Sequence, residues 1–144
     1  MAVDSFVAPW LGSKVKRTGS IHSEMEIVLG LSAFILAASL LFVAGGSAKL
    51  AGVAAMRTDA EHFGFHCGIY RLIGAAEFAG GLIVCTARLA QQPLLGVVAA
   101  TGLTALMFGT MAFHLKVTDS AVKAVPAAVF ALTAGIVTCL FAVN

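Results

Sequence analysis

The feature that most constrains this chain is a set of four long apolar runs, the first of which carries no charged side chain over residues 27–48. Roughly 20 apolar residues in an α-helix, each rising ~1.5 Å, cross the hydrocarbon core of a bilayer. The sequence is 60% hydrophobic and only 11% charged, which leaves too few charges to cover a water-facing surface. The pattern predicts an all-α integral membrane protein built as a four-helix bundle.

Three polar breaks separate these runs. Residues 56–66 are rich in charged and imidazole side chains, residues 88–93 combine an arginine and two glutamines with a proline, and residues 116–120 form the third break. Proline suits the first turn of a helix, so a span should begin at Pro93. We expect a polar amino-terminal segment, residues 1–26, and one membrane domain, residues 27–144, with spans at about 27–48, 68–87, 93–115 and 121–143.

Charge and cysteine content exclude several classes of function. A net charge of +2 forms no basic stripe, so nucleic acid is not an expected partner, whereas membrane lipid is. Cys67, Cys85 and Cys139 are odd in number and form no C-x-x-C pair, which indicates neither a disulfide framework nor a zinc site. The first 26 residues lack the features of a cleaved secretory signal, so we expect the first span to be a retained anchor.

Alternation of span direction gathers the polar residues at one membrane face. The end of the first span, the start of the second, the end of the third and the start of the fourth must all lie there. The polar side chains expected at this face are Lys49, Arg71, Glu77, His114, Lys116, Asp119 and Lys123, with His62 and His66 in the connection above them.

Glu77 is the strongest candidate for a functional residue. An ionisable side chain inside a span costs several kcal/mol unless it pairs, takes up a proton or meets water. Arg71 lies roughly 9 Å away along the helix and about 240° around it, so the two side chains do not share a stripe. Lys49 and His114 are the expected partners. The alternative is a self-satisfied polar cluster that ties helices together and binds no ligand.

Other polar patterns give weaker indications. His62 and His66 have a spacing compatible with a metal but no H-E-x-x-H pattern, so we expect no metal site and interpret this segment by default as an amphipathic interfacial stretch. Met107, Met111 and His114 share one helix face. We interpret them as packing residues rather than haem or copper ligands, because no second histidine lies within a span to complete a bis-histidine haem site.

Three short motifs resemble the DoxX-like family of small four-helix membrane proteins. They are the Lys49-Leu50 that ends the first span, the Gly74-Ala-Ala-Glu77 of the second and the His114-Leu115 that ends the third. The resemblance covers about residues 28–141. It implies four helices and a polar site formed by Lys49, Glu77 and His114.

The resemblance implies a role but not one reaction. Founding members of the family are subunits of a thiosulfate:quinone oxidoreductase, bacterial relatives associate with redox enzymes under thiol stress, and animal relatives assist assembly of ion-channel receptors. We therefore expect a multi-pass protein of a bacterial cell membrane that serves an oxidoreductase complex and binds a quinone or another small lipophile. Glu77 and His114 would be the catalytic residues, and Lys49, Arg71 and His66 would bind the ligand.

Other classes of function stay open at this point. The main alternative is a non-catalytic assembly or structural factor that holds a protein partner or a second copy of the chain. A stand-alone isomerase or hydrolase has no nucleophile or metal motif behind it. Ion transport has no relay of charges across the membrane, because Glu77 is the one deep charge.

Overall fold

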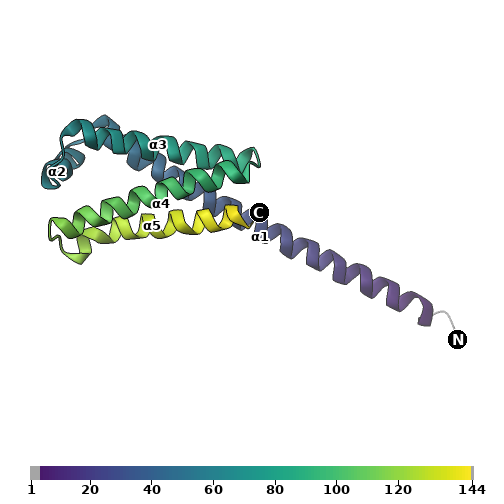
Figure 1. Ribbon diagram of the computed structural model, residues 1–144. Coiled ribbons are helices and arrows are strands. Elements are labelled where there is room, and N and C mark those ends of the chain that lie inside the picture. The colour runs from purple at the N-terminus through teal and green to yellow at the C-terminus, as the bar shows by residue number, and fades with distance from the viewer. Residues whose placement is uncertain (1–3, 144) are drawn as a thin grey trace. The chain divides into compact units, whose positions relative to one another are not determined.

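Residues 4–143, the part of the chain that the computed structural model describes, form five α-helices, with side chains described from residue 21 onward except for Ala121. They are α1 (Asp4–Ala51), α2 (Ala54–His62), α3 (Cys67–Leu89), α4 (Pro93–Lys116) and α5 (Ala121–Ala142) (Figure 1). Four stretches are long and apolar enough to cross a membrane: Ile21–Ala51, Cys67–Leu89, Pro93–Lys116 and Val122–Ala142. The predicted all-α membrane bundle is confirmed.

Two helical segments lie outside the predicted spans. Helix α1 begins at Asp4, so residues 4–26 of the expected polar segment are helical, while its first three residues lie outside the described part of the chain. Helix α2 lies within the polar break before α3. The chain divides into two compact units, residues 1–33 and residues 34–144. The second unit contains the bundle.

Glycines let α1 and α3 come into backbone contact. A Cβ added at Gly46 would lie 2.6 Å from the Gly74 carbonyl oxygen and 2.5 Å from the Phe78 nitrogen, and one added at Gly74 would lie 2.6 Å from Lys49 Cβ. In lipid, such small residues allow close approach and favour helix association through van der Waals contact. This contact places the carboxyl-terminal turn of α1 directly beside the first half of α3.

Aromatic and aliphatic side chains close the bundle on its other sides. Leu103 of α4 packs onto Gly80 of α3, and Phe141 of α5 packs onto Gly96 of α4. Phe42 of α1 meets Phe130 of α5 edge to face, with ring centroids 5.1 Å apart. The helices therefore contact one another in the cyclic order α1, α3, α4, α5.

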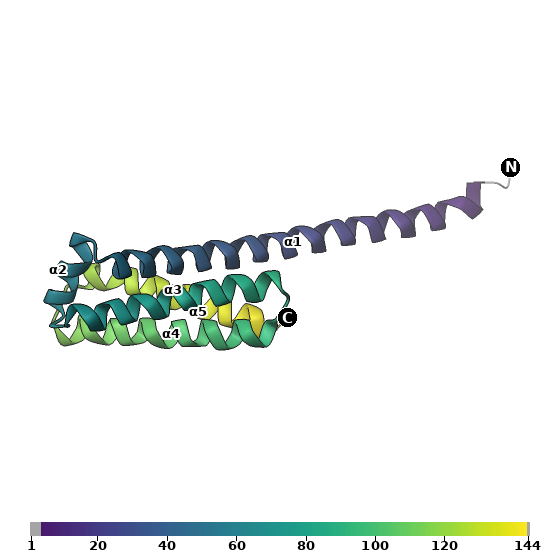
Figure 2. The same ribbon diagram turned by 90° about the horizontal axis from the view of Figure 1, so that it is seen from above.

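Helix α2 lies at the end of the bundle where α1 ends, α3 begins and α4 turns into α5 (Figures 1 and 2). We call this the α2 end. Helix α1 stops there in a Schellman turn, in which Gly52 has φ +61° and the Val53 N–H donates to the Ala48 carbonyl at 3.4 Å. The polar residues expected to share one membrane face therefore do lie at one end of the bundle.

We expect Gly74→Ala to destabilise the bundle by about 1–3 kcal/mol, because the added methyl group overlaps Lys49 and the backbone of α1. Thermal unfolding in a mild detergent measures the change. Gly102→Ala is the matched control, since a Cβ at Gly102 of α4 has nothing within 4 Å. Equal melting temperatures of the two variants would contradict the close contact between the backbones of α1 and α3.

Candidate functional site

The site is built around a buried ion pair between α1 and α3. The buried side of α3 repeats at Tyr70, Gly74, Glu77 and Gly81, so helical periodicity turns Glu77 toward α1, and this residue is only 3% exposed. Lys49 Nζ donates to Glu77 Oε1, and its own side chain is 16% exposed. The pair places opposite charges together where either charge alone would be costly.

The Tyr70 ring lies beside this pair and separates two cavities. Its centroid is 5.7 Å from Lys49 Nζ, close enough for a cation–π contact, and its hydroxyl donates to Met56 Sδ at 3.9 Å. Tyr70 and Lys49 line both cavities. One aromatic ring and one ammonium group thus form a shared wall.

The first space, which we call the aromatic cavity, has a volume of about 200 Å³. Phe65 and Phe113 meet in its wall with ring centroids 4.5 Å apart. Aliphatic side chains and Thr110 complete the lining, and Lys49 is the charged residue among the described lining residues. The lining suits a flat apolar group that carries a hydrogen-bond acceptor.

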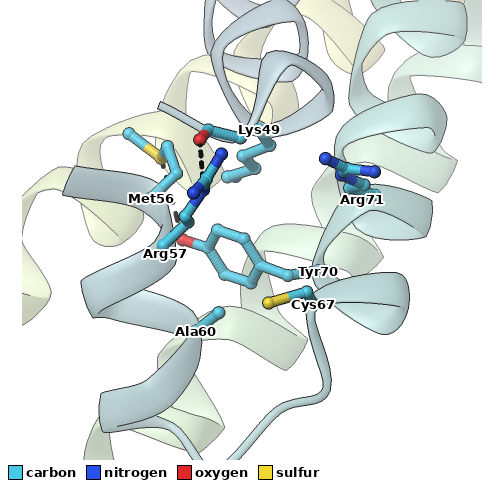
Figure 3. A pocket seen from close by; sticks show the side chains of 8 residues that line it. Lys49, Met56, Arg57, Ala60, Cys67, Tyr70 and Arg71 are labelled. Atoms are coloured by element: carbon cyan, nitrogen blue, oxygen red, sulfur yellow. Dashed lines mark hydrogen bonds between the residues drawn. The ribbon is translucent and has the colours of Figure 1, made fainter. Parts of the chain in front are cut away.

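The second space, the cationic cavity, has a volume of about 210 Å³ and lies between α2 and α3 (Figure 3). Arg57 of α2 and Arg71 of α3 line it from opposite sides, together with Lys49. Arg57 Nε donates to the Gly52 carbonyl at 2.7 Å, which ties α2 to the end of α1. No carboxylate lines this cavity among its described residues.

Asp119 fastens α2 to the turn between α4 and α5. His62 Nε2 donates to its Oδ1 at 2.8 Å, His114 Nδ1 donates to its Oδ2 at 2.9 Å, and Lys123 Nζ donates to Oδ1 at 3.1 Å. The Asp119 side chain is only 3% exposed. Burial of the carboxylate favours its protonated form, but the hydrogen bonds from these three residues outweigh burial and lower the pKa of Asp119 from 3.8 to about 2.

The structure brings together only part of the predicted site. Of the two partners expected for Glu77, Lys49 is the one it contacts. His114 instead forms a hydrogen bond with Asp119 and packs against Phe63, with ring centroids 4.7 Å apart. Arg71 lines the cationic cavity. His66 is the exposed N-cap residue of α3 and is not among the described lining residues of either cavity.

Sequence reasoning passed over several side chains that shape the site. Tyr70 lies seven residues before Glu77 and therefore on the same helix face, a signal that a search for charged residues did not use. Arg57 is exposed and also lines a cavity. Phe63, Phe65 and Phe113 carry no local sequence signal, since their meeting depends on how the α2–α3 connection folds over α4.

Fold and site define the class of this protein as a multi-pass membrane bundle of four spanning helices with a buried lysine–glutamate pair at one end. The sequence model of the DoxX-like family matches residues 32–136, and the chain belongs to that family. No curated protein and no solved structure matches it. The matched range contains both cavities and all four members of the Asp119 cluster.

We expect Glu77→Gln to lower the free energy of unfolding by about 3 kcal/mol, because the Lys49 ammonium is left buried without its carboxylate. The double variant Lys49→Met/Glu77→Gln should recover more than half of that loss. Unfolding in detergent followed by circular dichroism measures both. Glu61→Gln, an exposed change on α2, is the control, and a Glu77→Gln variant as stable as the wild type would refute a structural role for the pair.

We expect Asp119→Asn to loosen α2, because the neutral amide binds His62 and Lys123 more weakly than the carboxylate does. Amide hydrogen exchange should become severalfold faster across residues 54–62, with Asp59→Asn on the exposed side of α2 as the control. The folded-state pKa of Asp119 is depressed, so its contribution to stability is complete above pH 3.8 and is lost as the pH falls toward about 2. Unchanged exchange in Asp119→Asn would mean that other contacts hold α2.

Proposed function

We propose that this protein is a membrane subunit of an oxidoreductase complex in a bacterial cell membrane, and that it binds a quinone or another small lipophile in the aromatic cavity. The observation that carries the proposal is the meeting of aromatic walls with the Lys49 ammonium group in a cavity of about 200 Å³. Family membership supports the membrane setting. The cavity supplies the chemical reason for the ligand class.

The residues present fit a quinone headgroup. Pockets for whole drug-sized ligands are typically ~300–1,000 Å³, so this smaller cavity suits a single ring, with any isoprenoid tail lying outside it. Phe65, Phe113 and Tyr70 offer ring faces and edges, and Lys49 offers N–H donors for a carbonyl oxygen. A bound quinone would accept two electrons and two protons.

In this proposal the charged pair orients the ligand and holds a proton near it. Lys49 donates to the ligand from the cavity wall, and Glu77 fixes the position of the Lys49 ammonium group from behind. His114 contributes from the rim, where it supports Phe63 and is itself held by Asp119. We therefore assign ligand contact to Lys49 and positioning roles to Glu77 and His114.

A second candidate function is a non-catalytic assembly or structural factor. The direct Lys49–Glu77 ion pair favours it, since this pair already satisfies both charges without a ligand. An apolar groove of about 620 Å³ between α4 and α5, lined by residues such as Phe108, Leu132 and Ile136, also offers surface for a neighbouring helix. The factor would lose partner association on mutation and would bind no quinone.

Filling the aromatic cavity separates the two functions. We expect a short-chain benzoquinone to bind saturably to the purified chain in a mild detergent, and Gly109→Leu to weaken binding roughly tenfold or more, or about 1.4 kcal/mol. Gly109 lines the cavity, and a Cβ at this position has nothing within 4 Å, so the leucine enters open space. The affinity of the chain for the quinone is measured by equilibrium dialysis, or by the change in fluorescence of a fluorescent quinone analogue on binding.

The control for this experiment is Gly102→Leu, which adds the same side chain to α4 away from the cavity, again with nothing within 4 Å of its Cβ. Both variants should melt close to the wild type. Absence of saturable binding by the wild type, or equal binding by Gly109→Leu and wild type, would rule out a quinone in this cavity and favour the assembly factor.

A further inference from the structure

The cationic cavity is lined by three cationic side chains and, among its described lining residues, by no carboxylate. It is lined by Lys49, Gly52, Met56, Arg57, Ala60, Cys67, Tyr70 and Arg71. Lys49 is paired with Glu77, which leaves the two guanidinium groups. In the described part of the chain, neither Arg57 nor Arg71 forms an ion pair with a carboxylate. The lining of the cavity thus carries two guanidinium groups that no carboxylate contacts directly.

The two guanidinium groups converge on one point. A Cβ added at Gly52 would meet Arg71 Nη2 at 3.3 Å and Arg57 Nε at 3.6 Å. Arg57 Nε is already used by the Gly52 carbonyl, so its terminal nitrogens remain available for another acceptor. Two cations held this close repel each other, and an anion between them removes that cost.

The position of the cavity along the bundle defines the depth at which an anion would lie. The first spanning stretch ends at Ala51 and the second begins at Cys67, and the cavity is bounded by residues on both sides of these ends. The ends of spanning helices lie near the phosphate headgroups of a bilayer, so an anion in this cavity would lie near that level. Arginine forks match the oxygens of phosphate in paired hydrogen bonds, which a lysine cannot do.

We infer that the cationic cavity binds a phosphate group, carried either by an anionic phospholipid headgroup or by a free phosphate ion. Arg57 of α2 and Arg71 of α3 bind the phosphate oxygens. The Lys49 ammonium group, which is paired with Glu77, adds a third positive charge beside them. This site does not require the proposed quinone function, since a quinone would occupy the aromatic cavity, and the two spaces share only Lys49 and Tyr70 among their described lining residues. Either site can exist without the other.

Cys67 provides a reporter inside the cavity. It lines the cavity and is exposed. Cys67, Cys85 and Cys139 are all free cysteines in the described part of the chain. In a Cys85→Ala/Cys139→Ala chain, an uncharged maleimide reports access to Cys67 without an electrostatic bias of its own. The full chain is used in mild-detergent micelles, with phosphatidylglycerol, phosphatidylcholine or inorganic phosphate as the added probe.

We expect phosphatidylglycerol to slow modification of Cys67, by roughly tenfold when its concentration is about ten times its dissociation constant, while phosphatidylcholine has little effect. Protection by phosphatidylglycerol alone identifies a lipid headgroup site, and protection by inorganic phosphate as well identifies a general phosphate site. Both results support the inference. Protection by neither probe overturns it.

Variants show whether the two arginines are responsible for the protection. Arg71→Gln and Arg57→Gln should each remove most of it, and Arg71→Lys should retain only part, because the charge stays but the fork is lost. Lys116→Gln removes a cation from the α2 end outside the cavity and should leave protection intact. Full protection in Arg71→Gln, or equal loss in Lys116→Gln, would show non-specific charge attraction and overturn the site.

Discussion

The contact between α1 and α3 is the interaction on which the rest of this structure depends. Lys49 and Glu77 can meet only because Gly46 and Gly74 allow the two backbones to touch, and the ion pair in turn is what makes two ionisable groups tolerable between apolar helices. A larger residue at either glycine would separate the charges, and a neutral residue at position 77 would leave a buried ammonium group. Packing and electrostatics are therefore coupled at one crossing.

That crossing also determines the site. Lys49 projects from the last turn of α1, so once it is bound to Glu77 it is fixed beside Tyr70 and becomes part of the wall between two cavities of different chemistry. On one side the ammonium faces phenyl rings, and on the other it faces guanidinium groups. Lys49 thus contributes a positive charge to both spaces, and Arg57 and Arg71 add to it on the cationic side. Any ligand that withdraws Lys49 from Glu77 must supply a negative group or an acceptor of similar strength, or it leaves Glu77 buried and unpaired.

The sequence allowed the spans and the polar end of the bundle to be predicted, because lipid demands long apolar helices and short connections force alternation. It did not resolve the partner of Glu77. Lys49 and His114 both lie near the correct depth, and the choice depends on how α1 and α4 are rotated about their axes, which composition does not encode. A short helix within residues 56–66 is compatible with the sequence, but the place of α2 and its aromatic neighbours is not predictable from it, since these nine mostly polar residues are held by contacts far away in the chain. The roles of Glu77, His114, Lys49, Arg71 and His66 in any reaction stay predictions.

Stability is distributed unevenly over this molecule, and the distribution bears on function. The α1–α3 crossing is buried, whereas α2 is fastened by a few polar contacts: Arg57 to the Gly52 carbonyl, His62 to Asp119 and Tyr70 to Met56. Two of these contacts involve a charged group, but polar contacts near solvent contribute only about 0–1 kcal/mol net. Regions held in this way open locally at a lower free energy than a packed core does. Because α2 and the connection that follows it supply residues to both cavities, local opening of this region would change the walls of both.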